Sequence, residues 1–295
     1  MAPVLLVGCG RWGSNILRDL VTIGRPTIVV DISSGALAAA APLAHATRRT
    51  LDISERVVGV IIATPAADHL ATVEQVAPFD VPIFVEKPLA TRTEDAERAV
   101  ALTGDRLFVM EKWRYHPGIE ALGALARSGE LGPVRAIRTW RFAWGDSHGD
   151  VDPIWTLLPH DLSIVREVLG FLPPAIDAIA ERGVDRVWGM TARLGPDPMC
   201  ALEASGRRPE RRRRIEVVFD AAVAVLDGSR DTAVEIHSDR GLRTIDVSVE
   251  PPLRRELEAF LGHLDGGPPP KSSGRDGAAV VRRICELRRL AGLDE

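Results

Sequence analysis

Lysine is scarce in this chain, although basic residues are not. Only Lys87, Lys112 and Lys271 are lysines among 37 basic residues, and the others are arginines. Acidic residues outnumber basic ones, and the formal net charge is −4. A protein of this charge has no overall positive field that would attract nucleic acid or an anionic membrane. We therefore expect a small-molecule partner, and the position of each lysine becomes informative.

Cysteine and long apolar runs are also scarce. Cys9, Cys200 and Cys285 are odd in number and widely separated, so we expect neither a disulfide framework nor a metal site. The longest apolar runs are far shorter than the roughly 18 residues that cross a membrane. The N-terminal MAPVLLVGCG has no basic region before its apolar stretch, so no signal peptide is predicted. These absences predict a cytoplasmic protein.

The residues that are present have the composition of a globular protein, with 45% hydrophobic and 26% charged residues. The length of 295 residues predicts about two domains. In residues 1–113, short apolar runs alternate with helical patterns. The runs are PVLLVG, TIVVD, VVGVIIATP, VPIFVEKP and RLFVMEKW. This alternation predicts a Rossmann domain over residues 1–113 with a parallel, doubly wound sheet.

Two of the intervening helices have recognisable ends. GSNILRDLVTIG is expected to stop at Gly24, because glycine commonly ends helices. TEDAERAVALTG is expected to begin with Thr93 as its cap.

The junction between the first strand and helix reads GCGRWGSN. Gly8, Gly10 and Gly13 fit the pattern in which one glycine permits a tight turn, the next admits a pyrophosphate, and the last lets helix and strand pack. The helix N-terminus then presents unpaired N–H groups to the phosphates. Asp31 ends the second strand at the spacing of a ribose-binding carboxylate. We predict a dinucleotide site, the alternative being a glycine-rich turn of another α/β protein.

Asp31 also bears on which dinucleotide binds. A carboxylate accepts hydrogen bonds from a 2′-hydroxyl group and repels a 2′-phosphate. The residues that follow include Ser33 and Ser34 and no adjacent arginine. The sequence therefore predicts NAD, with NADP as the alternative.

After Trp113 the pattern changes to long strands that follow one another. PVRAIRTWRFAWG places its apolar residues two or four positions apart, as in a half-buried strand; they are Val134, Ala136, Trp140, Phe142 and Trp144. Further strands are expected at RVWGMTARL, RRIEVVFDAAVAVLDG, AVEIHSD and RTIDVSV, the last two joined in a hairpin by SDRG. We predict an α/β domain over residues 114–295 with an open, mainly antiparallel sheet, which binds the substrate and mediates oligomerisation.

Two segments of this second part need a separate interpretation. ELEAFLGHLDGG and GAAVVRRICELRRLAG are expected to be helices, and an alternative is that they pack back on the Rossmann domain. The basic run GRRPERRRR is interpreted as a solvated loop rather than a nucleic-acid site, because the chain as a whole is acidic.

Several segments, taken in order, resemble the glucose–fructose oxidoreductase / inositol dehydrogenase / MocA (Gfo/Idh/MocA) family. They are GCGRWGSNILR, ATPAADH, VEKPLA, WTLLPHDLSI and ELEAFLGHLDGGPPP. The resemblance covers essentially the whole chain. It implies a Rossmann domain followed by an open-sheet domain, a homodimer or homotetramer, and NAD(P)-dependent hydride transfer. The expected substrate carbon is a carbinol or ketone of a sugar, nucleotide sugar or cyclitol.

Lys87 stands in FVEKPLAT at the carboxyl end of a predicted parallel strand, where doubly wound folds bind ligands. Hydride transfer at a carbinol also requires a proton to leave or reach the oxygen. A lysine can exchange that proton, whereas a guanidinium stays protonated. We predict that Lys87 is catalytic, and the resemblance implies a cis bond before Pro88. The alternative is a strand-ending turn with a solvated ion pair.

His160 is the second catalytic candidate. DPIWTLLPHDLSIVREVLG predicts a helix with Pro159 in its first turn. By resemblance, His160 matches the family's catalytic histidine, which would act as acid and base near neutral pH. Many family members carry aspartates where this chain has Thr156 and Ser163. The carboxylate partner of His160 therefore stays open.

The remaining candidates fall into two groups. Cofactor contacts are also expected from Arg11, Trp12, Thr64, Pro65, His69 and Glu86. Substrate contacts are expected from Lys112, Arg114, Tyr115, Thr156 and Asp161. For His69 the alternative is a solvated helix face, and for the segment 112–116 it is an interdomain polar network.

Three functions follow from these observations. The first is an NAD(P)-dependent sugar or cyclitol dehydrogenase or reductase. The second is a reductase of another C=O or C=N group, such as an imine. The third is a nicotinamide-sensing protein without turnover, against which the presence of both Lys87 and His160 argues.

Overall fold

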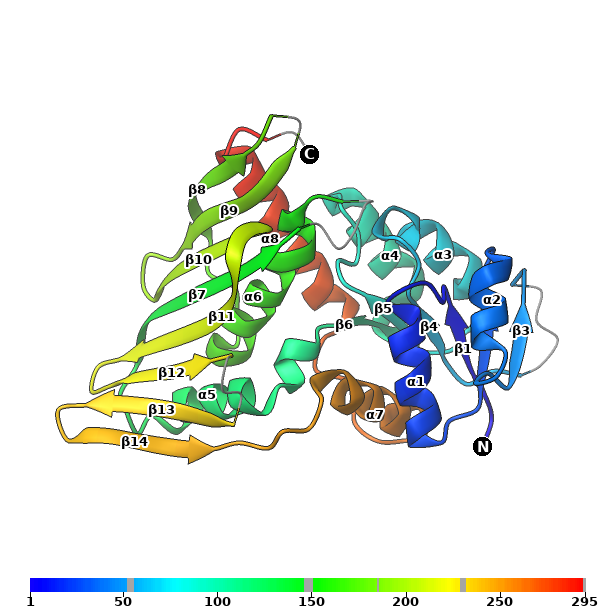
Figure 1. Cartoon of the computed structure of the whole chain (residues 1–295), viewed down its shortest axis with the longest axis horizontal. Coiled ribbons are helices and arrows are strands. Elements are labelled where there is room, and N and C mark those ends of the chain that lie inside the picture. Colours follow the sequence, from blue (N-terminus) through cyan, green and yellow to red (C-terminus); the bar gives the residue numbers. More distant parts are fainter. Residues whose placement is uncertain (52–55, 146–150, 185, 229–231, 294–295) are drawn as a thin grey trace. The chain divides into compact units, whose positions relative to one another are not determined.

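The computed structural model describes residues 1–51, 56–145, 151–184, 186–228 and 232–293. The chain forms two compact units (Figure 1). The first unit consists of Met1–Glu111 and Leu253–Val281, and the second of Lys112–Pro252 and Arg282–Glu295. The predicted division between residues 113 and 114 lies just inside the second unit, and the C-terminal segment is shared between the two.

A six-stranded parallel sheet forms the centre of the first unit, with the order β3-β2-β1-β4-β5-β6. Its strands are β1 (Val4–Val7), β2 (Thr27–Val30), β3 (Ala46–Arg48), β4 (Val60–Ile62), β5 (Ile83–Glu86) and β6 (Leu107–Met110). Its helices are α1 (Gly13–Ile23), α2 (Ser34–Ala40), η1 (Ala66–Asp68), α3 (His69–Val76), η2 (Ala77–Phe79), α4 (Thr93–Thr103), η3 (Gly104–Arg106) and α7 (Pro252–Leu264). The predicted parallel, doubly wound sheet is confirmed.

Burial explains which strands the sequence revealed. Every residue of β1, β2, β4, β5 and β6 is buried, and strands covered on both faces have continuous apolar runs. The short edge strand β3 is only half-buried along its length. It has no apolar pattern, and the sequence analysis missed it.

The helix ends agree with the sequence at α1 and differ from it at α4. Gly24 ends α1 in the left-handed conformation, as predicted. The cap position of α4 is Arg92, which makes no side-chain cap hydrogen bond, and Thr93 is the first helical residue. The prediction of a Thr93 cap was therefore wrong. Glu94 and Asp95 lie in the first turn, where their negative charge stabilises the helix dipole.

Helix α7 belongs to the core of the first unit, although it follows the second-unit sheet in the sequence. Leu257 and Phe260 are fully buried in one cluster with Ile16 and Leu17 of α1. The ring of Phe260 stacks on Phe84 of β5 with 4.8 Å between centroids. The core of the first unit is thus completed by a helix from the far end of the chain.

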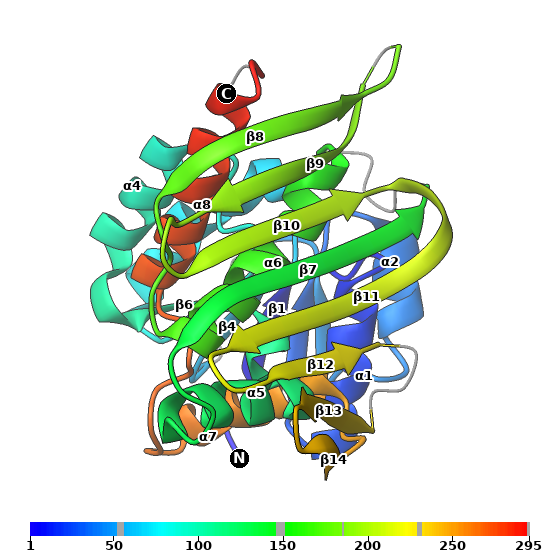
Figure 2. The same cartoon turned by 90° about the vertical axis from the view of Figure 1, so that its left-hand side faces the viewer.

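The second unit contains an eight-stranded sheet in the order β14-β13-β12-β11-β7-β10-β9-β8, seen face-on in Figure 2. The strands are β7 (Val134–Trp144), β8 (Ala175–Arg182), β9 (Val187–Leu194), β10 (Met199–Ser205), β11 (Arg207–Phe219), β12 (Val223–Asp227), β13 (Ala233–Ser238) and β14 (Gly241–Asp246). The helices are η4 (Lys112–Tyr115), α5 (Pro117–Ser128) and α6 (Pro153–Leu169). All pairs are antiparallel except β7 with β10, which confirms the predicted open, mainly antiparallel sheet. Helix α8 (Gly274–Leu290) begins in the first unit and ends in the second.

One face of this sheet is apolar and is covered by α5 and α6. Ile137, Leu202 and Val217 on that face are fully buried. The other face, called the open face below, carries exposed Trp144 and Ile179. Because residues alternate between faces, the predicted apolar side of β7 belongs to the open face, and the most deeply buried side chains of β7 point the other way.

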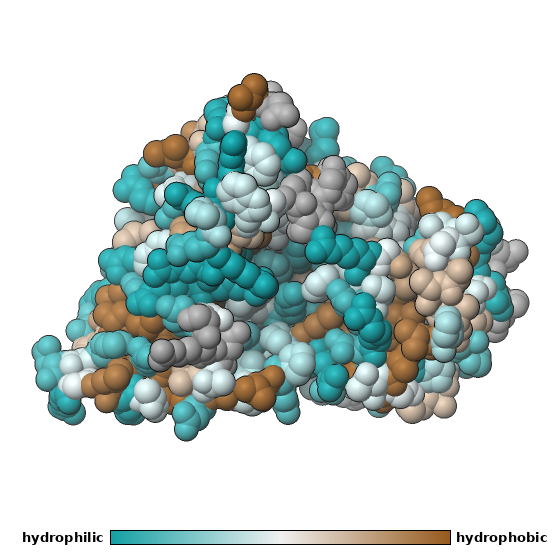
Figure 3. Space-filling model, in the orientation of Figure 1, coloured by the Kyte–Doolittle hydropathy of each residue, from teal (hydrophilic) through white to brown (hydrophobic). Residues whose placement is uncertain are grey.

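Arginine–carboxylate pairs cross the open face. They are Arg138–Glu216, Arg193–Asp177 and Arg214–Asp227, each between neighbouring strands. The basic run 206–214 lies almost wholly in β11, so its interpretation as a loop was wrong. In Figure 3, hydrophilic side chains gather over this part of the second unit. Within the described residues, no helix is long and apolar enough to cross a membrane.

Candidate functional site

The glycine-rich turn between β1 and α1 is shaped for an anion. Gly8 has φ +88°, and a Cβ atom there would lie 2.6 Å from the carbonyl oxygen of Ala63. A Cβ atom on Gly13 would lie 2.2 Å from the carbonyl oxygen of Gly8, whereas one on Gly10 would meet no atom within 4 Å. The cap residue Trp12 makes no side-chain cap hydrogen bond. Ser14 and Asn15 of the first turn donate their N–H groups to the carbonyl oxygens of Gly10 and Trp12 at 3.0 and 2.9 Å. The open space beside Gly10 therefore suits the approach of a pyrophosphate to the start of the helix, where the dipole favours an anion.

Asp31 is held at the end of β2 by this turn. Its Oδ2 accepts a hydrogen bond from the Cys9 N–H at 2.7 Å, and its Oδ1 accepts one from the Ser33 N–H at 2.8 Å. Burial, and next the Asp31 carboxylate, raise the pKa of the Cys9 thiol. The carboxylate thus has a fixed position beside the glycine-rich turn, which suits contact with a ribose.

An arginine contacts the residue that follows Asp31. Arg49 follows β3 and donates a hydrogen bond from its guanidinium to the carbonyl oxygen of Ile32 at 3.0 Å. No arginine is adjacent to Asp31 in the sequence, and Arg49 reaches this place through the fold. Arg49 is distant from Asp31 in sequence, and only the unpredicted pairing of β3 with β2 brings it there.

His69 joins the ends of two strands. It is buried, with 1% exposure, so the alternative of a solvated helix face is wrong. Its Nδ1 lies 2.8 Å from the carbonyl oxygen of Pro88, and its Nε2 lies 3.0 Å from that of Thr64. Thr64 and Pro65 lie between β4 and η1. His69 thereby fixes the segment after β5 to the segment after β4.

Lys87 follows directly on β5 and is fixed on both sides. The Glu86 side chain, with 7% exposure, accepts a hydrogen bond from the Lys87 N–H at 3.1 Å through Oε2. Its Oε1 accepts a hydrogen bond from the indole N–H of Trp12. The Lys87–Pro88 peptide bond is cis, as the resemblance implied. A buried Glu86 is not the solvated partner of the alternative interpretation.

The helix that carries His160 begins earlier than predicted. Asp152 is the cap of α6 and accepts a hydrogen bond from the Ile154 N–H at 3.0 Å, and Pro153 occupies the first turn. Pro159 lies inside the helix, so its placement in the first turn was wrong. An Asp–Pro pair is a stronger helix start than a lone proline, because the carboxylate caps while the proline presets φ.

Three arginine–carboxylate pairs fix α6 along its length. They are Arg288–Asp152 at 2.6 Å, Arg141–Asp161 at 2.9 Å and Arg114–Glu167 at 3.0 Å. The arginines come from α8, β7 and η4 respectively. Two predicted substrate contacts, Arg114 and Asp161, therefore have structural partners. Both side chains are largely buried, with 12% and 1% exposure.

Asp161 is the most deeply buried of these carboxylates. Burial raises the pKa of its carboxyl group, and the neighbouring Arg141 guanidinium opposes that rise. Thr156, also buried, donates its hydroxyl hydrogen bond to the carbonyl oxygen of Pro153 at 3.2 Å. Neither residue supplies an exposed carboxylate beside His160.

His160 lies against an aromatic and cationic cluster that the sequence did not reveal. Its ring meets Trp113 edge-on, with 6.4 Å between centroids, and Trp113 stacks on His116 at 5.0 Å. The guanidinium carbons of Arg141 and Arg213 lie 4.5 and 5.7 Å from the Trp113 ring centre. Arg141 and Arg213 are opposite each other on β7 and β11, and no short motif marks such a pairing.

The predicted residues thus gather into two groups, one in each unit. In the first unit, Gly8, Gly10, Gly13, Asp31, Thr64, Pro65, Glu86 and Lys87 lie at or beyond the carboxyl ends of strands. Arg11 and Trp12 belong to the same glycine-rich turn, and His69 opens α3. In the second unit, Lys112, Arg114 and Tyr115 lie in η4, which packs on α6 with its Thr156, His160 and Asp161.

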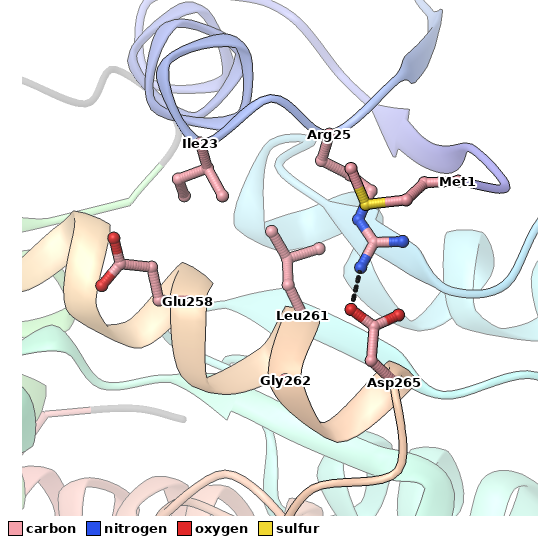
Figure 4. Close-up of a pocket in the computed structure, with 7 residues that line it drawn as sticks. All are labelled: Met1, Ile23, Arg25, Glu258, Leu261, Gly262 and Asp265. Atoms are coloured by element: carbon pink, nitrogen blue, oxygen red, sulfur yellow. Dashed lines mark hydrogen bonds and ion pairs between the residues drawn. The ribbon is translucent and has the colours of Figure 1, made fainter.

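A small pocket lies elsewhere in the first unit (Figure 4). Its lining includes Met1, Ile23 and Leu261, with the ion pair between Arg25 and Asp265 at one side. Arg25 precedes β2, so this pocket lies near the amino ends of the strands. Ligands of doubly wound sheets bind at the carboxyl ends, and the pocket therefore does not belong to the candidate site.

Comparison with known proteins identifies relatives over the whole chain. Residues 3–107 match the family model described as "Oxidoreductase family, NAD-binding Rossmann fold". Inositol 2-dehydrogenase of Rhizobium meliloti (strain 1021) is 25% identical, with 97% of this chain and 98% of that protein covered. D-apiose dehydrogenase of Paraburkholderia graminis is 28% identical, with 95% and 84% covered.

Solved structures share the fold. UDP-N-acetylglucosamine 3-dehydrogenase from Acidithiobacillus ferrooxidans superposes with a TM-score of 0.86 at 24% identity. The superposition covers 98% of this chain and 97% of that one. The fold of the chain therefore has a solved counterpart.

Proposed function

We propose that the chain is a member of the Gfo/Idh/MocA oxidoreductase family and transfers a hydride between NAD and a carbinol or ketone carbon of a sugar, nucleotide sugar or cyclitol. Its relatives are named as dehydrogenases of inositol, apiose and a nucleotide sugar. The observation that carries the proposal is Lys87 at the carboxyl end of β5, held through both of its neighbours.

The first unit would hold the cofactor through residues already in place. The N–H groups at the start of α1 would bind the pyrophosphate, and Asp31 would accept hydrogen bonds from the adenosine ribose. The bound nicotinamide supplies or accepts the hydride. The absence of a side-chain cap hydrogen bond from Trp12 and the open side of Gly10 support this assignment.

Lys87 would exchange the proton of the reacting oxygen. An ammonium group that donates to this oxygen stabilises the negative charge that develops on it. In its neutral amine form the side chain can take up the proton when a carbinol is oxidised, and as the ammonium it can return the proton when a ketone is reduced. Its backbone is fixed by Glu86 on one side and by the His69–Pro88 contact on the other, and a fixed donor costs little reorganisation.

His160 would be a second acid or base in the second unit. An imidazole can gain or lose a proton near neutral pH. Its helix is fixed by ion pairs on both sides of His160 in sequence. Arg213, which is only partly buried beside the Trp113 ring, offers a group that binds hydroxyls. Asp161 and Arg114 would then act by positioning rather than by contact with substrate.

The open face of the second-unit sheet supports self-association as a homodimer or homotetramer. Exposed apolar side chains on this face, including Trp144 and Ile179, are costly to leave in water when they gather in a patch. The arginine–carboxylate pairs on the same face would set the register of a partner rather than supply most of the affinity.

A substrate screen tests the proposed reaction. The purified protein is supplied with NAD⁺ and cyclitols, free sugars or nucleotide sugars, and with NADH and the corresponding ketones or cyclic imines. We expect cofactor turnover with at least one sugar-like alcohol or ketone, and none with the Lys87→Met variant. Turnover of imines alone would overturn the proposed substrate class, and cofactor binding without turnover of any compound would favour a sensor.

A further inference from the structure

We propose that Trp12 and Glu86 transmit occupancy of the pyrophosphate site to Lys87, so that a bound diphosphate fixes the lysine in position. This inference rests on the proposed function only in that Lys87 is its catalytic residue. Trp12 and Glu86 are positioning residues in this proposal, and neither needs to touch the reacting atoms.

The physical link is a single carboxylate between two segments. Trp12 belongs to the glycine-rich turn and is the cap of α1, so its backbone is part of the anion site. Its indole N–H donates to one oxygen of Glu86, and the other oxygen accepts the backbone N–H of Lys87. The turn after β1 is thus connected to the residue after β5 through one side chain.

The position of Glu86 makes this link stiff. The side chain is buried, with 7% exposure, and a carboxylate is planar, so one oxygen cannot move without the other. Trp12 packs against the core cluster of the first unit, which limits the alternative positions of its ring. Hydrogen bonds to a charged acceptor away from bulk water are stronger than those between neutral groups.

A bound diphosphate would act on this link at its Trp12 end. Backbone N–H groups that bind an anion lose freedom, and the turn that contains Trp12 becomes more rigid. Glu86 and the Lys87 backbone would follow, because each is hydrogen-bonded to the previous group. Coupling of this kind is reciprocal, so a change at Lys87 should also alter the affinity for the diphosphate.

The scarcity of lysine makes the effect measurable. With only Lys87, Lys112 and Lys271 in the chain, the acylation rate of each amine can be followed by mass spectrometry. ADP is the probe, because it carries a diphosphate but neither the nicotinamide nor its ribose, which would cover Lys87 directly. Lys271 serves as the internal reference.

Two variants break the link at different ends. Trp12→Phe removes the indole N–H and keeps an aromatic ring. Glu86→Gln keeps the shape of the side chain and leaves one oxygen where the carboxylate has two, so it cannot accept from both N–H groups. Trp144→Phe, a change at an exposed tryptophan of the second unit, is the matched control.

We expect ADP to slow acylation of Lys87 at least about fivefold in the wild type and in Trp144→Phe, a size typical of coupling between sites. Trp12→Phe and Glu86→Gln should lose this response when each variant is saturated with ADP, whatever its affinity for ADP. The same response in Glu86→Gln, or none in the wild type, would overturn the proposal. If Trp12→Phe no longer binds ADP, Glu86→Gln alone decides.

The result is independent of whether Lys87 proves catalytic. Acylation reports the environment of the amine, and no substrate is present in the experiment. A normal ADP response combined with full activity of Lys87→Met would remove the proposed catalytic role and leave the link in place. If ADP does not slow acylation of Lys87 in the wild type but Lys87→Met is inactive, the proposed link is removed and the catalytic role is left in place.

Discussion

Lys87 combines a flexible side chain with a backbone that is held on both sides. The Glu86 carboxylate accepts its N–H, and His69 contacts the carbonyl of Pro88. The ammonium group can therefore move over a short range while its point of attachment stays fixed. Such a group suits an oxygen that changes charge during a reaction.

Replacing Lys87 with methionine should remove proton exchange and leave cofactor binding intact. Methionine keeps an unbranched, apolar stem and lacks the ammonium group. We expect kcat to fall at least about a hundredfold, because acid–base catalysis alone typically contributes that much. The measurements are NADH affinity and steady-state kinetics with a substrate found in the screen.

Lys87→Arg is the companion change, because it keeps the charge and replaces an amine that can lose its proton with a guanidinium that stays protonated. A rate near that of the wild type would mean that Lys87 only positions the substrate. His160→Asn should also slow turnover, and the two losses should be less than additive if both residues act on one proton.

Asp31 should make the protein prefer NADH to NADPH. Its carboxylate would repel a 2′-phosphate, and the preference should be at least about tenfold in dissociation constant, since one lost hydrogen bond to a charged group costs that much or more. Asp31→Ser should narrow the difference. Fluorescence titration with both dinucleotides measures it, with Asp105→Ser, at a highly exposed side chain, as control.

The position of Arg49 beside Ile32 limits how large this preference can be, because a guanidinium stabilises a 2′-phosphate. Equal or tighter binding of NADPH to the wild type would show that Arg49 outweighs Asp31.

A residue of the candidate site could be predicted when its contacts come from its own short motif, and could not when they come from distant parts of the sequence. The turn glycines, Asp31 and Lys87 lie in short motifs at strand ends, and motif and position could be recognised together. Trp113, Arg141, Arg213 and Arg49 are brought to their places by strand pairing or helix packing between distant segments. The sequence has no local pattern that records such contacts.

Helix α6 depends on ion pairs that it makes with three different elements. The central pair, Arg141–Asp161, is almost completely buried, with 3% and 1% exposure. A buried pair adds little net stability compared with apolar residues, but removing one partner leaves a charge without compensation. His160 lies next to Asp161 in sequence, so the pair also fixes the catalytic candidate.

Arg141→Met should therefore destabilise the protein by about 3–5 kcal/mol, the range for breaking a buried pair. Arg193→Met breaks an exposed pair on the same sheet and should cost about 1 kcal/mol or less. Denaturant unfolding of both variants gives the comparison. Similar losses in the two variants would mean that Arg141 contributes nothing beyond a surface contact.

The loss in Arg141→Met should also depend on pH. Burial raises the pKa of the Asp161 carboxyl, and Arg141 opposes the rise, so removing Arg141 raises this pKa further. The contribution of a raised pKa is fully present below the unfolded value, about 3.9 for aspartate, and is lost as pH rises through the folded value. The destabilisation should be smallest in acid and grow toward neutral pH.

Whether a strand could be predicted depended on whether one or both of its faces are buried. Strands buried on both faces have continuous apolar runs and were found. The missed strands β3, β8 and β10 contain residues of intermediate exposure or small size and lack such runs. In β11, the part from residue 213 onward was expected as a strand, and the arginine-rich part before it was not. Within that part, Arg208 pairs with Glu203 and Arg207 stacks on Trp188, which are contacts between different strands that have no local sequence pattern.

At the scale of the whole molecule, the main feature is the large sheet of the second unit. Helices α5 and α6 cover one of its faces, and the other is the open face. Self-association through that face predicts a homodimer or homotetramer at micromolar concentration in sedimentation experiments. Ile179→Glu places a charge on an exposed apolar position of β8 and should shift the protein toward monomer, because burying an unpaired charge is costly.

Val249→Glu is the control for this change, since Val249 is equally exposed but lies outside the sheet. A monomeric wild type at micromolar concentration would contradict the prediction. An oligomer unaffected by Ile179→Glu would place the contact on another surface.

The return of the chain to the first unit has a consequence for the order of synthesis. The first 111 residues leave the ribosome with the surface around Phe84 uncovered, because α7 and its Phe260 follow the whole second-unit sheet. The second unit in turn draws on Arg288, near the end of α8, to hold the cap of α6. Each unit therefore needs a segment from the C-terminal part of the chain before its fold is complete. Both units should acquire protease resistance late and nearly together during translation.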